Sequence, residues 1–244
     1  MKNFMEKALN IFFPKKLKCM FCGRDIDYKN KPYCDFCEKE KFFNNSKSRC
    51  KICDMPIVGE VEYCDNCKQN HKSFDKAFCP FIYEGNVRKS LLKFKSQNAK
   101  YLAEPMAKIM AEKLIDENLE FDIIIPIPMT EKSLKKRGYN QALLLAEEIS
   151  KILNKPLCTD VLFKTRDTKH QKELGFNDRQ KNLAGAFGLE NIKKIKGKNI
   201  LLVDDILTTC ATVDSCSSLL KKYSNNVYVC CFARNIYKKQ NKIQ

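Results

Sequence analysis

From about Ala77 onward, apolar runs of strand length alternate with segments whose apolar residues recur at helical spacing. The predicted strands are residues 77–83, 121–128, 199–203 and 226–233. The predicted helices are residues 101–115, 141–153 and 212–223. Strands that alternate with helices indicate βαβ units and a mainly parallel sheet. The nearly uninterrupted apolar strands are typical of a sheet that is covered on both faces. The pattern therefore predicts an α/β domain.

The residues before this domain carry cysteine pairs instead of a regular apolar period. Eight of the 14 cysteines form four CxxC pairs, namely Cys19/Cys22, Cys34/Cys37, Cys50/Cys53 and Cys64/Cys67. The first two pairs, with Tyr33 just before Cys34, recur in the last two, with Tyr63 just before Cys64. A repeated unit favours two sequential four-cysteine sites over a cross-braced pair. We expect a module with an N-terminal helix over residues 1–75 and the α/β domain over residues 76–244.

Each pair of CxxC motifs supplies the ligand set of a structural zinc ion. Such sites bind Zn²⁺ through four tetrahedral thiolates, with closely spaced pairs closing each half. Few apolar residues lie between Cys19 and Cys67, and a segment without a core of its own needs a metal to fold. We expect two structural Zn²⁺ ions. Because all eight thiolates are used as ligands, neither site keeps an open catalytic position.

A second group of polar residues follows the predicted strand 199–203. Asp204 and Asp205 come directly after it, followed by a hydroxyl-rich loop and the start of a helix. Ligands of open α/β sheets bind at such strand ends. Paired carboxylates suit ribose hydroxyls or a largely hydrated Mg²⁺, and threonine hydroxyls with helix N-terminal N–H groups suit a phosphate. The pattern favours a ribose 5-phosphate site. A plain strand end with two helix-capping candidates is the alternative.

Residues 200–212 resemble the phosphoribosyl pyrophosphate (PRPP) signature of type I phosphoribosyltransferases. The resemblance implies that Asp204 and Asp205 hold the ribose hydroxyls and, through water, Mg²⁺. It implies that the 5-phosphate is held by Thr208, Thr209, Cys210, Ala211 and Thr212. Cys210 stands where the family usually has glycine. If this position has a positive φ, a non-glycine residue costs about 1–2 kcal/mol, and its side chain would crowd the phosphate. Catalysis is therefore an open question.

A basic motif lies upstream, in the run from Lys135 through Arg137 to Gln141. Arg137 offers the planar fork that binds pyrophosphate, although a solvated basic turn explains the run equally well. With the prolines Pro126 and Pro128, the segment 171–187 and the cysteine repeat, this motif resembles the ComF/GntX family. The resemblance implies a zinc module before a phosphoribosyltransferase-like domain. It also implies a role in DNA uptake or natural transformation beside a competence helicase.

The formal net charge of +16 is compatible with two hypotheses on the function. Eight thiolates and two zinc ions lower this surplus but leave it strongly positive, which attracts phosphate-rich partners such as single-stranded DNA. A lysine-rich genome composition explains the same surplus. One hypothesis is a phosphoribosyltransferase with an unidentified acceptor and Arg137, Asp204 and Asp205 as catalytic residues. The other is a non-catalytic nucleic-acid-binding or scaffold protein that recruits a helicase through its zinc module.

The expected location is the cytoplasm. The N-terminal residues lack the pattern of a signal peptide, and no run approaches the roughly 20 apolar residues of a membrane span. Clustered cysteines outside a secreted protein indicate metal binding in a reducing compartment.

Overall fold

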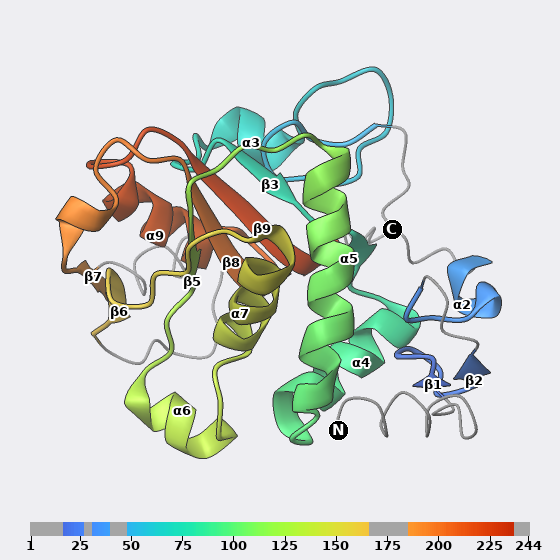
Figure 1. Ribbon diagram of the computed structural model, residues 1–244. Coiled ribbons are helices and arrows are strands. Elements are labelled where there is room, and N and C mark those ends of the chain that lie inside the picture. The colour runs from blue at the N-terminus through green and yellow to red at the C-terminus, as the bar shows by residue number, and fades with distance from the viewer. Residues whose placement is uncertain (1–16, 27–30, 40–47, 166–184, 237–244) are drawn as a thin grey trace, which may run out of the picture. The chain divides into compact units, whose positions relative to one another are not determined.

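The computed structural model describes residues 17–26, 31–39, 48–165 and 185–236 (Figure 1). By its contacts the chain forms two compact units, residues 1–41 and 42–244. The first four-cysteine segment belongs to the first unit, whereas the second belongs to the same unit as the sheet. The predicted division after residue 75 stays a prediction. The predicted N-terminal helix lies outside the described residues, as does most of the segment 171–187.

The first unit is built around a short hairpin. β1 (Leu17–Lys18) pairs antiparallel with β2 (Asp25–Ile26), and α2 (Asp35–Lys39) follows. The turn between the strands contains Gly23 at φ 77°, a conformation that favours glycine because it has no Cβ. The rings of Phe21 and Tyr33 lie 5.7 Å apart between centroids. Among the described residues of this unit few apolar side chains are buried, which fits a unit that depends on a metal.

The second unit contains a parallel sheet, which confirms the predicted fold class. Its strands are β3 (Lys76–Phe78), β4 (Phe81–Ile82), β5 (Ile123–Pro126), β8 (Ile200–Leu207) and β9 (Val227–Arg234). The order is β3-β9-β8-β5, β4 also pairs with β9, and every pairing is parallel. The predicted strand 77–83 is interrupted at Pro80, which has no N–H for a ladder hydrogen bond. The central strands β8 and β9 carry the apolar runs.

Helices cover both faces of this sheet. Figure 1 shows α5 and α7 on one face and α9 on the other. The helices are α3 (Asp65–Gln69), α4 (Gly85–Ser96), α5 (Ala103–Asp116), α6 (Glu131–Arg137), α7 (Gln141–Leu153) and α9 (Ala211–Leu220). Short 3-10 turns span Lys100–Leu102 and Ile192–Lys194, and β6 (Leu162–Lys164) pairs antiparallel with β7 (Phe187–Leu189). Among these described helices, none has the length and apolar character needed to span a membrane.

The predicted helices agree with the structure to within a few residues, and α7 has the predicted bounds. Helix α4 was not predicted, because residues 85–96 are mostly polar and bury a narrow stripe. That stripe contains Val87, Ser90, Leu91 and Phe94. An amphipathic helix with so few apolar residues depends on packing against the rest of the unit.

The second four-cysteine segment packs into the core on the α9 face of the sheet. Alternate residues of β8, including Leu202, share one apolar cluster with Cys50, Cys53 and Phe74. The backbone docks as well: Ala77 N donates to Ile52 O at 2.7 Å. This segment therefore contributes to the same hydrophobic core as the sheet.

We expect Leu202→Ala to lower the free energy of unfolding by about 2–5 kcal/mol, because it leaves a cavity in a fully buried central strand. Leu92→Ala is the matched control, since Leu92 is 40% exposed on α4, and its effect should stay within about 0.5 kcal/mol. Urea denaturation of the zinc-loaded protein measures both. Equal effects of the two substitutions would contradict this assignment of the core.

Candidate functional site

The structure groups the eight paired cysteines into two clusters. One cluster contains Cys19, Cys22, Cys34 and Cys37, and the other contains Cys50, Cys53, Cys64 and Cys67. We call these the first and the second cluster. In each, the four Sγ atoms lie within 4.8 Å of one another. The grouping is sequential, as the repeat predicts, and not cross-braced.

The geometry of both clusters fits a zinc ion. The Sγ atoms of Cys22 and Cys34 lie 3.6 Å apart, as do those of Cys53 and Cys64. A tetrahedral site with Zn–S distances of about 2.3 Å has sulfur–sulfur edges of about 3.8 Å. A disulfide needs about 2.05 Å, and all 14 cysteines are free. Either cluster could therefore hold Zn²⁺ through four thiolates.

The same type of backbone turn occurs once in each cluster, which shows that the sequence repeat is a structural repeat. Gly23 N donates to Cys19 O at 2.9 Å, and Asp54 N donates to Cys50 O at 3.0 Å. Gly23 and Asp54 both have positive φ, at 77° and 57°. In the second cluster the aspartate also accepts a hydrogen bond from Cys79 N at 2.7 Å. The residue at this turn thus connects the second cluster to the sheet.

The acidic pair lies within β8, which continues two residues beyond it. Lys95 Nζ forms an ion pair with the Asp205 carboxylate at 3.0 Å. Asp204 Oδ1 accepts a hydrogen bond from Asp205 N at 2.8 Å. Burial, and next the charge of Asp205, raise the pKa of Asp204 to about 7, while Lys95 opposes the shift. Burial disfavours the charged form of Lys95, but Asp205 and Asp204 outweigh it and raise its pKa above the ordinary value. The charges of Lys95, Asp204 and Asp205 therefore interact with one another.

Local sequence signals position Arg137 opposite this pair. Thr130 caps α6 by accepting from Ser133 N at 3.2 Å, and Gly138 ends the helix at φ 82°. Asn140 then caps α7, its side chain accepting from Ala142 N at 3.0 Å. The intervening Tyr139 donates its hydroxyl proton to Phe94 O on α4. The turn between α6 and α7 is thereby attached to the helix that supplies Lys95.

Arg137, Asp204 and Asp205 line one polar cavity of about 130 Å³. Asn140, Gln141 and Lys164 also line it. Arg137 donates to Gln141 Oε1 at 3.3 Å, whereas the buried Nε2 of Gln141 makes no hydrogen bond to another described residue. Carboxylates beside cations suit a ligand that carries both hydroxyls and phosphates. The carboxylates also fit a Mg²⁺ that keeps most of its water.

The loop from Thr208 to Thr212 joins β8 to α9, which begins at Ala211. These residues do not line the polar cavity. Cys210 has φ 68°, so it adopts the strained conformation at a cost of about 1–2 kcal/mol. The expectation that its side chain crowds the phosphate is wrong. Cys210 is 2% exposed and its thiol faces Cys53, so it points into the protein instead.

The Cys210 thiol interacts with the second cluster as a hydrogen-bond donor. Its hydrogen bond, followed by those of the other cluster cysteines, holds the pKa of Cys53 far below the usual range. The same contact, together with burial, raises the pKa of Cys210.

Sequence reasoning missed Lys95, Lys164 and Gln141 as site residues. Gln141 belongs to the basic motif but carried no assigned role. Lys95 lies on the unpredicted helix α4 and Lys164 on the short strand β6, and neither stands out in a chain with 45 lysines and arginines. Only the tertiary structure brings them to Asp204 and Asp205.

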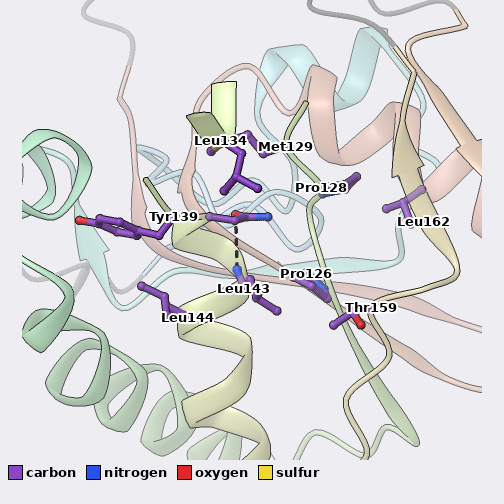
Figure 2. A pocket seen from close by; sticks show the side chains of 10 residues that line it. Pro126, Pro128, Met129, Leu134, Tyr139, Leu143, Leu144, Thr159 and Leu162 are labelled. Carbon is purple, nitrogen blue, oxygen red and sulfur yellow. Dashed lines mark hydrogen bonds between the residues drawn. The ribbon is translucent and has the colours of Figure 1, made fainter. Parts of the chain in front are cut away.

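A second, apolar cavity adjoins the polar one. It has a volume of about 290 Å³, and it shares Pro128, Met129 and Asn140 with the polar cavity. Figure 2 shows Leu143 and Leu144 of α7, Pro126 of β5 and Leu162 of β6 around it. Its walls offer apolar surface next to the charged groups.

Comparisons with known proteins agree with this geometry. Residues 100–243 match the phosphoribosyl transferase domain. The chain belongs to this family. The acid pair lies in the second half of the central parallel strand β8, and the loop 208–212 follows this strand.

Several curated relatives of this phosphoribosyl transferase domain protein match over most of the chain. Competence protein F of Haemophilus influenzae is 28% identical, over 84% of this chain and 91% of that protein. DNA utilization protein YhgH of Shigella flexneri is 24% identical, over 89% and 97%. Competence protein ComFC of Streptococcus pneumoniae is 25% identical, over 84% and 94%. The predicted resemblance to the ComF group agrees with these matches.

We expect Cys64→Ser to remove one zinc ion and to lower the stability of the sheet unit by about 2 kcal/mol or more, because the second cluster shares its core. Cys34→Ser is the matched control at the equivalent repeat position. It should also remove one zinc ion but leave the unfolding of the sheet unit unchanged. Atomic absorption gives the zinc content, and urea denaturation followed by circular dichroism gives the stability. Equal destabilisation by both substitutions would refute the assignment.

We expect Lys95→Met to raise the pKa of Asp204 above about 7, because it removes the cation that favours the charged carboxylate. Carboxyl ¹³C resonances of labelled aspartate, followed from pH 4 to 9, report this pKa. Lys108→Met on α5 should leave the titration unchanged. An ordinary aspartate pKa for Asp204 in the parent protein would be inconsistent with the burial described here.

Proposed function

We propose that this protein binds PRPP with Mg²⁺ at the polar cavity and transfers its phosphoribosyl group to an acceptor during DNA uptake. The observation that carries the proposal is the meeting of Arg137 with Asp204 and Asp205 in one cavity. A guanidinium fork and paired carboxylates are the groups needed for a diphosphate and a ribose.

Each part of the ligand has a counterpart in this proposal. Asp204 and Asp205 accept hydrogen bonds from the ribose hydroxyls, and the loop 208–212 with the N-terminus of α9 binds the 5-phosphate. Arg137 and Lys164 bind the diphosphate. Bound Mg²⁺ supplies neutralisation of the leaving pyrophosphate. The bond from the anomeric carbon to pyrophosphate breaks, a bond to the acceptor forms, and the acceptor loses a proton.

The adjoining apolar cavity supports an acceptor with an apolar ring face. Its walls are Pro126, Leu143, Leu162 and neighbouring residues, and it meets the polar cavity at Pro128 and Asn140. An acceptor held there lies beside the anomeric carbon of a ribose on the acid pair. Positioning of the two reactants is the main contribution the protein makes to such a displacement.

The biological setting comes from the relatives. Proteins named for competence and DNA utilization match most of this chain, which supports a role in DNA uptake. Single-stranded DNA and a competence helicase are the partners we propose in the cytoplasm.

A non-catalytic role in nucleic-acid binding is the second candidate. The strained Cys210 in place of glycine and the net charge of +16 favour it. In that case single-stranded DNA binds with an affinity that falls steeply as salt rises.

We expect isothermal calorimetry to detect PRPP·Mg²⁺ binding by the zinc-loaded protein, and Asp204→Asn/Asp205→Asn to weaken it by about 100-fold. Two charge-assisted hydrogen bonds of about 1.5 kcal/mol each are lost in that variant. Asp116→Asn, an exposed position at the end of α5, is the control and should bind like the parent. Pyrophosphate release assays with candidate bases and amines then test for transfer.

Failure of the parent protein to bind PRPP, together with salt-dependent binding of single-stranded DNA, would overturn the enzymatic proposal. It would favour the non-catalytic role. PRPP binding that survives the double substitution would instead place the ligand elsewhere on the chain.

A further inference from the structure

The buried side chain of Arg234 connects the second cluster with the loop that follows β8. It lies at the end of β9 and is 1% exposed. Its Nη1 donates to Leu207 O at 2.8 Å and to Thr208 O, at the start of the phosphate loop. Its Nη2 donates to Cys53 Sγ of the second cluster at 3.7 Å. One rigid guanidinium therefore contacts both the loop and a metal ligand.

The buried positive charge of Arg234 indicates that the second cluster carries negative charge. No described carboxylate forms an ion pair with this guanidinium, and a buried charge without a counter-charge is strongly destabilising. Four thiolates around one Zn²⁺ leave two negative charges uncompensated. Cys53 in a zinc-loaded cluster thus supplies the anion that Arg234 needs.

Two further contacts run between the same elements. The Cys210 thiol interacts with Cys53, so the residue that departs from the glycine pattern is used as a contact to the cluster. Ser73, six residues after Cys67, donates its N–H to Asp214 Oδ1 in the first turn of α9 at 2.6 Å. Contacts of Arg234, Cys210 and Ser73 therefore connect the loop and the start of α9 with the second cluster and the segment that follows it.

We infer that zinc at the second cluster and a phosphate ester on the loop 208–212 strengthen each other's binding through Arg234 and Cys210. Both residues act as positioning residues, because they hold the loop and do not face the ligand cavity. The nature of the ligand rests on the proposed function, whereas the connection between cluster and loop does not. Coupling of this kind is reciprocal, so each partner raises the affinity of the other by the same factor.

Hydrogen bonds to a metal-ligating side chain have a measurable effect on metal affinity. Removing a hydrogen bond to a metal-bound side chain lowers metal affinity by about 10- to 100-fold. We expect Arg234→Lys to have this effect on the second cluster, because lysine keeps the charge but cannot contact the loop and Cys53 together. The first cluster lies in the other compact unit and is the internal control.

The test uses the full chain loaded with ¹¹³Cd²⁺, whose two resonances report the two clusters separately. Without ligand, Arg234→Lys and Cys210→Ala should shift the resonance of the second cluster and leave the first unchanged. Cys210→Ser restores a donor at the same strained position and should return the resonance toward the parent. Chelator competition with the zinc-loaded proteins then measures the loss of affinity.

Addition of PRPP·Mg²⁺ should move the same resonance alone, and calorimetry should show about 10-fold weaker PRPP binding by Cys210→Ala than by Cys210→Ser. PRPP binding with both cadmium resonances unmoved would overturn the coupling while leaving the proposed function intact. Absence of PRPP binding defeats the proposed function, and the ligand-free variants then decide the coupling. Unmoved resonances in those variants refute the connection between cluster and loop.

Discussion

The parallel pairing of β8 with β9 determines where the chemical groups of this protein lie. The register runs from Ile200 opposite Val227 to Leu207 opposite Arg234. Along β8 it brings the acid pair to the carboxyl end of the sheet, and along β9 it brings Arg234 under the loop that follows. Because β9 also pairs with β3 and β4, the second cluster is attached to the same strand through residues 76–82. A slip of one residue would turn every side chain of these strands to the opposite face.

The polar cavity balances charges that would be costly if left alone. Asp205 is buried and the adjacent Asp204 is partly buried, and the charge of Asp205 disfavours the ionised form of Asp204. Lys95 pairs with Asp205, which keeps this arrangement tolerable without a ligand. In the proposed function, a ribose with its Mg²⁺ takes over part of that role, and Arg137 and Lys164 bind the diphosphate. Under that proposal, a bound ligand replaces internal charge pairs of the cavity with charge pairs of its own.

Cys210 shows how a departure from a family pattern acquires a structural meaning. Its positive φ of 68° is the conformation for which glycine is the usual choice, and the Cβ atom of Cys210 adds strain at that position. Burial against Cys53 gives the side chain a contact that glycine cannot make. Packing and the contact with Cys53 offset the strain of about 1–2 kcal/mol. The side chain therefore points into the protein and away from the solvent.

The sequence by itself determined the features that depend on local spacing. Apolar runs identified the central strands, helical spacing identified α7, and the CxxC repeat determined which four cysteines form each cluster. Strand, acid pair and threonine loop in succession indicated a candidate phosphoribosyl site, because these groups are neighbours in the chain. Only the tertiary structure decided what comes from distant segments. Lys95 reaches Asp205 across more than 100 residues, the second cluster joins the core of the sheet, and Arg234 lies between Cys53 and Thr208. Such contacts arise from long-range packing and burial, and a lysine, an arginine or a cysteine carries no local signal of the partner it will meet.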